Sequence, residues 1–438
     1  MITKNTRDRI IFILLVLAFR VSLDIFYIAY QPALEVKWLF QYNLRNGFEI
    51  FMSYFLLIIV SIVMPIYTDR PSKFVLFILF LFSYMSASSF IMFNNQIDFS
   101  PFSVLTTFFI IMSLLLRDKV TGDIQLNIKD SNIQGKNAML IILIFIALLT
   151  VIQVATFGFK LQPPNLLEVY DIREEYKTAA GRFSGYATTW TANVFTAFLF
   201  AYGIIYKKFL FTVSALVLVI YIYSITGMKS TIFSLAFVSL VLFSYKVFKK
   251  RMILFLVGFF LFANTMILLF LENEKVWMTG ILFTRRLFMV TAQLFFFYTD
   301  YVKTHTYDFF AQNFPFSLFM TSDYDKNIPY IIGDEIYNMP KLAANANIFA
   351  DFYFNIGPFG LLILAFIFYW ILKLADALAR GKNNALVFSL FIMPTLAMTN
   401  GAFLTSLLTH GFLIAIVVLY FYQEPKSSNS SVSFKMSK

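Results

Sequence analysis

Twelve long apolar stretches with almost no charged residues follow one another along the chain. A helix needs about 20 mostly apolar residues to cross the hydrocarbon core of a bilayer, so each stretch is a predicted membrane span. Lipid offers no partner to backbone N–H and C=O groups, which favours helices that satisfy these groups internally. The predicted spans lie at about 10–30, 48–67, 73–93, 101–116, 138–158, 186–205, 209–225, 230–248, 252–271, 357–375, 384–401 and 403–422.

Composition supports the same fold class. Of the 438 residues, 59% are apolar and 13% are charged, whereas soluble domains have about 45–50% apolar and about 25% charged residues. We therefore predict an all-α, polytopic integral membrane protein with about 12 transmembrane helices, and we exclude a water-soluble class. The chain has no cysteine and two histidines. Disulfides and thiolate metal sites are excluded, and we expect neither a metal nor a cofactor.

Basic residues predict how the chain is oriented, because cytoplasmic loops carry an excess of Lys and Arg. With the N-terminus in the cytoplasm, 21 of the 35 Lys and Arg residues fall on the cytoplasmic side, 13 fall outside, and Arg20 lies within a span. We thus predict that both termini are cytoplasmic and that the long loops are external. The net charge of +11 then reflects orientation and attraction to anionic inner-leaflet lipid. Membrane lipid, and not nucleic acid, is the expected partner.

The predicted organisation has four parts. Residues 1–271 hold helices 1–9 with an external loop at about 159–185, residues 272–356 form a long external loop with interfacial helices, residues 357–422 hold helices 10–12, and residues 423–438 form a disordered cytoplasmic tail. The long loop between helices 9 and 10 is too rich in aromatic residues for disorder. Its stretch from Arg285 to Val302 predicts an interfacial or re-entrant helix that begins at Arg285.

Several polar residues lie inside the predicted spans. Arg20 and Asp24 stand four residues apart in the first span, so they share a helix face and predict a structural ion pair. Five single polar residues are predicted to form hydrogen bonds between helices, as polar residues in spans usually do: Gln153, Asn193, Asn264, Asn400 and His410.

Three cationic sites remain on the predicted external side. Lys229, followed by Ser230, occupies a short turn at a predicted helix start, Arg182 follows Gly181 at another, and Arg285 and Arg286 stand side by side in the long loop. Backbone N–H groups at a helix start and guanidinium groups suit phosphate oxygens. Contact with lipid headgroups is the alternative interpretation. The acids of the long loop, among them Asp334, Glu335 and Asp351, suit a general base or sugar hydroxyls.

Four motifs in this part of the chain resemble those of the Wzy-type O-antigen and capsule repeat-unit polymerases and of the related O-antigen ligases. They are Arg182, Gly185 and Asn193; Thr226 to Ser230; Arg285 or Arg286 through Gln293 and Leu294; and Asn345 to Phe349 followed by Gly357 and Gly360. The ligases carry a histidine before the asparagine of the last motif, whereas this chain has Ala346 there. This departure argues against ligase identity and leaves the general base unassigned.

The resemblance implies a GT-C-like membrane glycosyltransferase that polymerises undecaprenyl-diphosphate-linked repeat units at the outer face of the bacterial plasma (inner) membrane, facing the periplasm. It implies a lipid-linked donor and a lipid-linked acceptor, inverting and metal-independent transfer, an O-antigen or capsule product, and a chain-length regulator as a further partner. The residues that would contact the phosphates or the reacting hydroxyl are Arg182, Arg285, Arg286 and Asp351. The residues that would bind substrate are Gly185, Asn193, Lys229, Ser230, Asn345, Asn347 and Glu335.

Two other classes of protein are consistent with about twelve membrane spans. A flippase for lipid-linked oligosaccharides would place its cations deep in the membrane and would use short loops on both sides, whereas this chain has a loop of roughly 85 residues between the ninth and tenth spans. A non-catalytic scaffold would not need external arginines that converge. Variants that accumulate lipid-linked units only on the cytoplasmic face would indicate the flippase.

Overall fold

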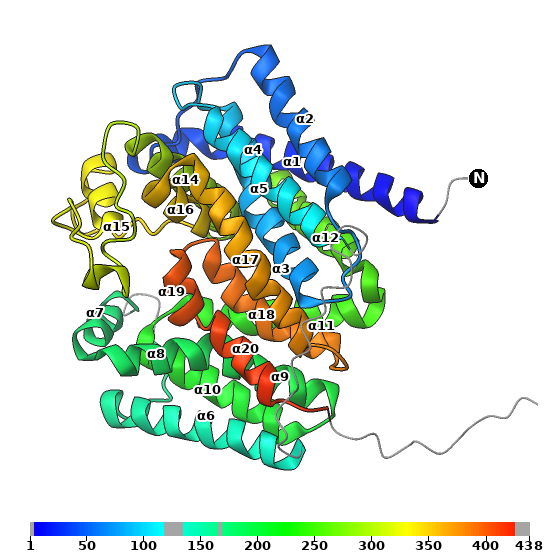
Figure 1. Cartoon of the computed structure of the whole chain (residues 1–438), viewed down its shortest axis with the longest axis vertical. Coiled ribbons are helices and arrows are strands. Elements are labelled where there is room, and N and C mark those ends of the chain that lie inside the picture. The colour runs from blue at the N-terminus through cyan, green and yellow to red at the C-terminus, as the bar shows by residue number, and fades with distance from the viewer. Residues whose placement is uncertain (1–3, 118–134, 165–168, 425–438) are drawn as a thin grey trace, which may run out of the picture.

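The computed structural model describes residues 4–117, 135–164 and 169–424. Within these ranges the chain forms helices joined by loops, with one isolated β-bridge between Asn43 and Asn94 (Figure 1). The first ten helical elements are α1 (Lys4–Trp38), α2 (Gly47–Val63), α3 (Pro71–Leu79), η1 (Phe80–Tyr84), α4 (Met85–Met92), α5 (Ser100–Leu115), α6 (Gly135–Phe157), α7 (Val169–Ala179), α8 (Arg182–Trp190) and η2 (Thr191–Phe195).

The remaining elements lie in the second half of the chain. They are α9 (Thr196–Ile205), α10 (Phe209–Thr226), α11 (Lys229–Phe248), η3 (Lys249–Arg251), α12 (Met252–Leu269), α13 (Glu274–Gly280), η4 (Ile281–Met289), α14 (Val290–Tyr301), η5 (Phe316–Leu318), α15 (Ile328–Ile331), η6 (Ile332–Ile336), α16 (Ile348–Ile356), α17 (Pro358–Leu378), α18 (Asn384–Met398), α19 (Phe403–Leu408) and α20 (Phe412–Phe421).

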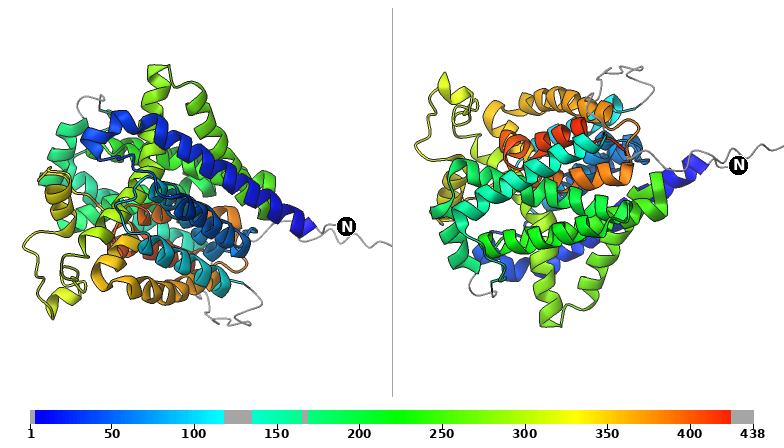
Figure 2. Two further views of the ribbon diagram at one scale, coloured as in Figure 1. Left: turned by 90° about the horizontal axis from the view of Figure 1, so that it is seen from above. Right: turned by 90° about the horizontal axis from the view of Figure 1, so that it is seen from below.

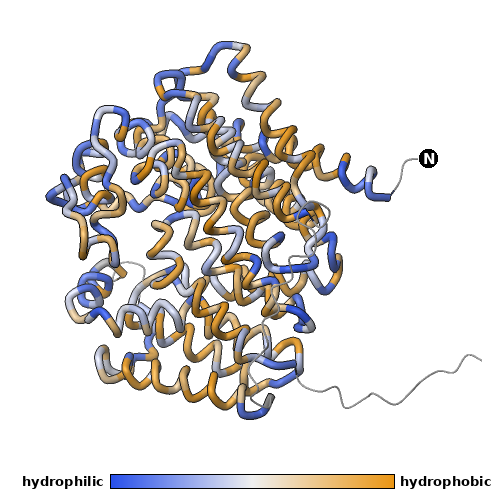
Figure 3. The backbone as a smooth tube through the Cα atoms, in the orientation of Figure 1, coloured by the Kyte–Doolittle hydropathy of each residue, from blue (hydrophilic) through white to orange (hydrophobic). Residues whose placement is uncertain are grey.

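The helices form a bundle with two polar ends. We name the end at which α1 begins and α20 ends the terminal end, and the end that carries α7 and α15 the loop end (Figure 1). Hydrophilic residues gather at these two ends, with hydrophobic helices between them (Figure 3). Arg251 pairs with Asp8 at 2.7 Å, which joins η3 to the start of α1 at the terminal end. The bundle thus has the apolar middle and polar ends of a membrane-embedded protein.

Each of the twelve predicted spans coincides with an apolar helix. Nine helical stretches of the described residues are long and apolar enough to cross a membrane, and eight of these stretches contain nine of the predicted spans, because Lys229–Leu269 holds two. The other three predicted spans coincide with shorter apolar helices, which are α2, α5 and α18. The all-α, polytopic membrane class is therefore confirmed, while the number of crossings stays a prediction. The predicted tail lies, beyond Glu424, outside the described residues.

One candidate span, Glu274–Tyr301, matches none of the twelve predicted spans and begins earlier than the predicted helix. The sequence predicts a helix that begins at Arg285, whereas α13, η4 and α14 run as one helix from Glu274 to Tyr301. The predicted start is wrong because Asn273 caps the helix earlier, its side-chain oxygen accepting the N–H groups of Lys275 and Val276. A capping Asn fixes a helix start by satisfying N–H groups that lack a partner in the first turn.

Both ends of this long helix contact the loop end of the bundle. Near its start, the Tyr30 hydroxyl donates to the Trp277 carbonyl at 3.1 Å, and near its end the Tyr298 hydroxyl donates to the Ala344 carbonyl at 2.8 Å. Together with α12 it forms a hairpin that projects from the side of the bundle (Figure 2). By length and composition the helix is a candidate span, and its interfacial or re-entrant placement stays a prediction.

Burial separates central from peripheral helices. The stretch Pro71–Met92, which contains α3, η1 and α4, is completely buried, whereas only 28% of α6 is buried. Leu140, Ile144 and Leu148 of α6 are exposed, as expected of side chains that face lipid tails. Small residues such as Ser88 and Ser89 of α4 let neighbouring helices approach closely.

The predicted ion pair in the first span is confirmed. Arg20 and Asp24 are both buried and lie 2.5 Å apart. Ser89 and Tyr54 each donate a hydroxyl to the Asp24 carboxylate at 2.5 Å, and Arg20 also donates to the hydroxyl and the carbonyl of Ser88. The pair thus joins α1 to α2 and α4, because every charge-bearing atom finds its partner on a neighbouring helix or within α1.

The predicted interhelical role is also confirmed for three of the single polar residues. Gln153 donates to the Ala187 carbonyl and the Thr191 hydroxyl, Asn264 donates to the Ser22 carbonyl, and Asn193 donates to the His410 carbonyl at 3.2 Å. Asn400 donates only to its neighbour Thr399.

We expect Asp24→Leu to lower the free energy of unfolding by about 3–5 kcal/mol, because it leaves the buried Arg20 charge without its carboxylate. The measurement is thermal unfolding of the purified protein in detergent. The double variant Arg20→Leu/Asp24→Leu removes both charges and should regain much of the lost stability. A single variant as stable as the unmodified protein, or a double variant less stable than the single one, would contradict the structural role of the pair.

Candidate functional site

Arg285 is a buried cation that has no polar partner among the described residues. It lies in η4, within the long helix and not at the helix start that the sequence predicts. The side chain is 6% exposed, its guanidinium lies 4.5 Å from the centre of the Trp38 ring, and its buried Nε has no hydrogen-bond partner. Buried charges are normally paired with an opposite charge. The next residue, Arg286, is exposed, so two guanidinium groups stand side by side, and no ion pair within the described ranges joins either one to a carboxylate.

A short hydrogen-bonded chain lies next to Arg285. The Tyr337 hydroxyl donates to Gln293 Oε1 at 3.1 Å, and Gln293 Nε2 donates to the Trp38 carbonyl at 2.6 Å. These bonds fix the Trp38 residue whose ring covers the guanidinium. They also attach α14 to the segment that follows η6, because Tyr337 comes directly after that element. Gln293 therefore has a positioning role beside the cation.

Asp351 is a buried carboxyl group on α16, the short helix that precedes α17. Its Oδ2 accepts the Phe403 N–H at 2.8 Å, and its Oδ1 accepts a hydrogen bond from the Asn355 side chain at 3.1 Å. Burial raises the pKa of Asp351 to about 7, the Phe403 N–H opposes this shift, and the nearby Asp308 adds to it. A carboxyl group that titrates near neutral pH can take up and release a proton under physiological conditions.

Asn355 attaches the long loop to α16, and Asp308 holds segments of the loop together. The Asn355 Oδ1 accepts the Phe310 N–H, and Asp308 accepts the Ser322 hydroxyl and the Gln312 N–H. Loop backbone that folds over a helix leaves N–H groups without partners, and these two side chains supply the acceptors. The loop is thereby held close to Asp351.

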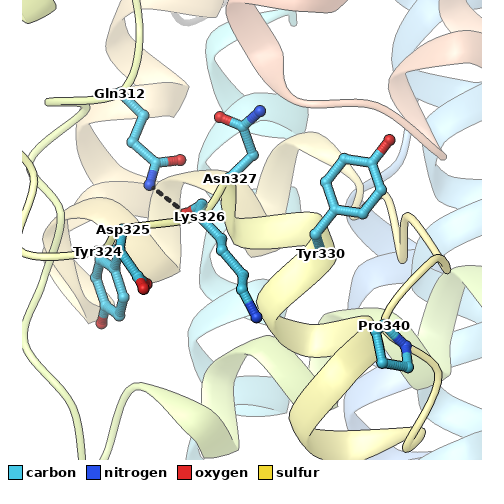
Figure 4. Close-up of a pocket in the computed structure, with 7 residues that line it drawn as sticks. All are labelled: Gln312, Tyr324, Asp325, Lys326, Asn327, Tyr330 and Pro340. Atoms are coloured by element: carbon cyan, nitrogen blue, oxygen red, sulfur yellow. Dashed lines mark hydrogen bonds between the residues drawn. The ribbon is translucent and has the colours of Figure 1, made fainter.

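A cavity of about 520 Å³ opens in the long loop, with its lining residues drawn in Figure 4. Two tyrosine rings, two side-chain amides, a carboxylate, an ammonium group and a proline line it, namely Tyr324, Tyr330, Gln312, Asn327, Asp325, Lys326 and Pro340. The Gln312 amide donates to the Lys326 carbonyl at 2.8 Å, while Lys326 pairs with Asp334 at 2.8 Å. Aromatic faces combined with amides and carboxylates suit a carbohydrate, which presents both C–H faces and hydroxyls.

The cavity is connected to both of the other features. The Tyr324 ring lies 5.5 Å from the Phe354 ring of α16, three residues after Asp351. Tyr330 belongs to α15, which continues into η6 and then into Tyr337 beside Gln293. The buried cation, the cavity and the buried carboxyl group are thus carried by one continuous set of packed elements.

The structure places the first predicted motif on a helix start. Arg182 is the first residue of α8, and it is exposed. A side chain at Gly185 would meet nothing within 4 Å, which leaves this face of α8 open. Asn193 lies in η2, the π-helical continuation of α8. The predicted helix start at Arg182 is therefore confirmed, and its ligand role stays a prediction.

The turn between α10 and α11 is formed as the sequence predicts. Gly227 ends α10 with φ +59, and a β-carbon there would lie 2.9 Å from the Val169 carbonyl, so the turn requires glycine. Lys229 is half-buried at the first position of α11, followed by the exposed Ser230. Arg173 of α7 donates to the Gly227 carbonyl at 3.1 Å. This arginine was missed by sequence reasoning, because nothing in the sequence links it to the turn.

The remaining predicted residues differ in exposure and in their hydrogen bonds. Asn345 is exposed. Asn347 caps α16, because its Oδ1 accepts the N–H groups of Phe349 and Ala350 and its Nδ2 donates to the Thr291 carbonyl. Glu335 is exposed and accepts the Tyr301 hydroxyl at 3.0 Å. Asn347 thus has a clear structural role, whereas Asn345 and Glu335 face solvent.

The structure brings some predicted residues together and leaves others apart. Asp351 and Asn193 both contact the segment that contains α19, through Phe403 and His410 respectively. No hydrogen bond, ion pair or ring contact of the described residues joins Arg182 or Lys229 to Arg285 or Arg286, and none of these four residues lines the cavity in the long loop. Arg182 and Lys229 lie on α8 and α11, and Arg285 and Arg286 lie on η4.

No group of three or more His, Asp or Glu side chains that could hold a metal ion occurs in the part of the chain that the structure describes. Comparison of the chain with protein-family models, with curated proteins and with solved structures finds no match. The function is therefore inferred from the residues of the site.

The raised pKa of Asp351 predicts a pH dependence of stability. The native state holds this proton up to about pH 7, whereas an unfolded Asp releases it near pH 4. Stability from this group is therefore full below about pH 4 and is lost as the pH rises to about 7. We expect the unmodified protein to lose stability relative to Asp351→Asn over that range, as measured by thermal unfolding in detergent. Parallel curves for the two proteins would contradict the assignment.

Proposed function

We propose that this protein is a membrane glycosyltransferase that joins lipid-diphosphate-linked oligosaccharide repeat units at the loop end of the bundle, as an O-antigen or capsule polymerase does. The observation that carries the proposal is Arg285, a buried guanidinium that lies against a tryptophan ring and has no anionic partner among the described residues. Desolvating a charge without a counter-ion costs several kcal/mol. An enzyme retains such a group when a substrate supplies the missing anion.

The chemistry of the transfer matches the three features of the site. The acceptor hydroxyl oxygen attacks the anomeric carbon of the donor sugar, and the bond from that carbon to the diphosphate breaks. Negative charge then develops on the diphosphate, which Arg285 and Arg286 stabilise through preplaced donors. The hydroxyl proton passes to the Asp351 carboxylate. Because attack and departure occur on opposite faces of the sugar, a single displacement inverts the configuration.

The cavity in the long loop supplies a place for the glycan. Its volume of about 520 Å³ falls within the range of about 300–1,000 Å³ of small-molecule sites. Tyr324 and Tyr330 offer aromatic faces, and Gln312 and Asn327 offer amides. The lipid carrier itself lies in the membrane, so a glycan that extends from it would reach this loop. The proposal thus assigns the diphosphate to η4 and the sugars to the loop.

The cations on α8 and α11 have a separate place in the proposal. Arg182 and Lys229 stand at helix starts, where backbone N–H groups and positive charge favour a phosphate. A polymerase binds two lipid-diphosphate substrates, a donor and an acceptor. We therefore assign Arg182 and Lys229 to the second of these lipid diphosphates. We assign the leaving diphosphate to Arg285 because it alone is buried.

Arg285→Met tests whether the buried Arg285 guanidinium binds the diphosphate. The substitution removes a buried charge that has no polar partner in the protein, so we expect the fold to be as stable as before or more stable. Polymer formation should fall by about 10²–10³-fold, because one preplaced donor group to the developing charge is lost. The measurements are polymer length in cells that supply the lipid-linked repeat units, and thermal unfolding of the purified variant.

Arg45→Met is the matched control, because Arg45 is also a buried arginine at the loop end. It pairs with Glu49 at 2.9 Å and donates to the Ile91 and Asn94 carbonyls, so its loss should lower stability. If Arg285→Met lowers stability as much as Arg45→Met does, or leaves polymer unchanged, the diphosphate assignment is wrong. Lipid-linked units that accumulate only on the cytoplasmic face would instead indicate a flippase.

Tyr330→Ala tests the glycan assignment. Tyr330 is 41% exposed at the cavity, so its loss should leave the fold intact. A stacking aromatic ring contributes about 1 kcal/mol beyond its buried area, and we expect the KM for the acceptor to rise by roughly 5-fold with little change in kcat. Phe319→Ala is the control, because Phe319 belongs to the same loop, is 83% exposed and lies outside the cavity lining. Equal effects of the two substitutions would refute the assignment.

A further inference from the structure

A second cavity, which we name the α1 cavity, lies where α1 ends and the chain turns towards α2. Its volume is about 590 Å³. The predicted first span ends near residue 30, so this last part of α1 lies beyond the predicted membrane boundary, on the same side as the proposed active site. Three side-chain amides, a carboxylate and a phenol line the α1 cavity, and they belong to Gln31, Gln41, Asn43, Glu35 and Tyr42.

Hydrogen bonds between α1 and the loop that follows it hold the wall of the α1 cavity in place. The Tyr27 hydroxyl donates to the Gln41 carbonyl at 2.5 Å. Gln31 Nε2 donates to the Phe40 carbonyl at 3.0 Å, which closes the turn at the end of α1. A ligand that enters the cavity therefore meets polar groups that are already positioned, and this lowers the entropy cost of binding.

The lining of the α1 cavity suits a neutral sugar. Among the described residues that line it, Glu35 alone is charged, so a phosphate would meet a carboxylate and no cation. Side-chain amides both donate and accept hydrogen bonds, and a carboxylate accepts them, which matches the hydroxyl groups of a sugar. The Tyr42 ring, which is 46% exposed, offers an aromatic face to the C–H groups. The cavity thus has the mixed apolar and polar lining of a small-molecule site.

Gln31 is the buried polar residue of the α1 cavity. It is 9% exposed, and its Nε2 donates to Glu35 Oε2 at 2.9 Å as well as to the Phe40 carbonyl. No hydrogen bond from the described part of the chain reaches its Oε1, although buried polar atoms normally have a partner. A sugar hydroxyl in the cavity would supply that partner and would also lie within reach of the Glu35 carboxylate.

One turn of the chain separates the α1 cavity from Arg285. The Trp38 ring lies 4.5 Å from the Arg285 guanidinium, and the next residue, Leu39, lines the cavity. Gln293 Nε2 donates to the carbonyls of both Trp38 and Leu39, at 2.6 and 3.3 Å, which fixes this turn against α14. A glycan is bonded directly to its diphosphate, so a diphosphate at Arg285 would bring the attached sugars close to this turn.

We propose that the α1 cavity binds the sugars of the donor glycan that extend from the diphosphate at Arg285, while the cavity in the long loop binds the acceptor glycan. This inference rests on the proposed function and deepens it, because the transfer requires two glycans to be bound at the same time. Each glycan then has its own cavity, and the donor cavity is the one whose wall also carries the Trp38 ring that covers the guanidinium.

A thiol at the cavity tests the binding of sugar directly. The chain has no cysteine, so Val36→Cys gives the full-length protein a single thiol in the lining, where Val36 is 93% exposed. The purified variant is treated with a maleimide in the presence of the repeat-unit oligosaccharide, released by mild acid from its lipid diphosphate. We expect the oligosaccharide to slow the labelling by about threefold, because a bound ligand covers the lining. Glu272→Cys, which is exposed and lies outside the lining, should be labelled at an unchanged rate.

Glu35→Ala tests whether the α1 cavity serves the donor. Glu35 is exposed, and its hydrogen bond comes from Gln31 Nε2, which keeps its bond to the Phe40 carbonyl, so the fold should stay intact. Because a hydrogen bond to a charged group is lost, we expect the KM for the lipid-linked donor to rise about tenfold. The kcat and the KM for the acceptor should change little, and Glu35→Gln, which keeps an acceptor oxygen, should retain most of the affinity.

The outcomes separate the α1 cavity from the proposed function. Protection of the thiol that is lost in Glu35→Ala, in a protein that forms no polymer, would support the sugar site and contradict the proposed function. Polymer formation that depends on Arg285, with no protection of the thiol and an unchanged donor KM in Glu35→Ala, would keep the function and overturn the cavity assignment. Calcium ions that protect the thiol in place of the oligosaccharide would also overturn it, because carboxylate and amide oxygens are calcium ligands.

Discussion

The bundle depends on one constraint, which is that polar groups removed from water must find partners inside the protein. The backbone groups of the spans form hydrogen bonds within their helices, and the few charged or polar side chains between helices form hydrogen bonds or ion pairs with partners on neighbouring segments. Arg20, for example, finds Asp24 and Ser88, and Asn264 finds Ser22 and Thr284. These contacts link α1 to its neighbours at points where apolar contact alone would not fix the register. For the same reason, a buried polar side chain without a partner in the protein indicates a candidate binding site.

The constraint also explains how the long loop is folded. Backbone outside regular helices has N–H groups that need acceptors, and the loop obtains them from side chains of α16 and of its own segment. Asn355 accepts the Phe310 N–H, and Asp308 accepts the Gln312 N–H. Aromatic rings then fill the space between the loop and the bundle, as Tyr324 does against Phe354. The loop is therefore a packed part of the protein that can carry a site.

The fold could be predicted from the sequence to a large extent, because runs of apolar residues have few alternatives in a membrane. All twelve predicted spans coincide with helices, and the Arg20–Asp24 pair followed from a spacing of four residues. The prediction failed at Glu274–Tyr301, where the charged residues Arg285 and Arg286 suggested a helix start. A charge inside an apolar helix is rare, so the sequence pattern favoured a boundary. Instead, Asn273 caps the helix earlier, and the Trp38 ring, which lies far away in sequence, covers the Arg285 charge inside it.

The candidate site could be predicted only in part, for a similar reason. Helix starts at Arg182 and Lys229 follow from local glycine-containing turns, and the structure has both. The pairing of Arg285 with Trp38, the contact of Asp351 with the Phe403 N–H, and the cavity around Tyr324 and Tyr330 all depend on the packing of distant segments. The cluster of tyrosine, aspartate and asparagine residues at 324–330 was the one local signal that could have indicated the cavity. Contacts between distant segments leave no comparable pattern in a single sequence.

Trp38, whose ring contacts Arg285, leaves the guanidinium free to bind an anion. A carboxylate beside this guanidinium would satisfy its charge but would also compete with a diphosphate for the same N–H donors. The face of a tryptophan ring attracts the cation through its quadrupole and accepts no strong hydrogen bond, so the donors stay available to oxygen atoms. The π-helical turn of η4, a distortion that is often found at functional sites, presents Arg285 and Arg286 from adjacent positions. In the proposed enzyme, the Trp38 ring would thus hold the buried cation in place while its N–H donors stay free for the substrate.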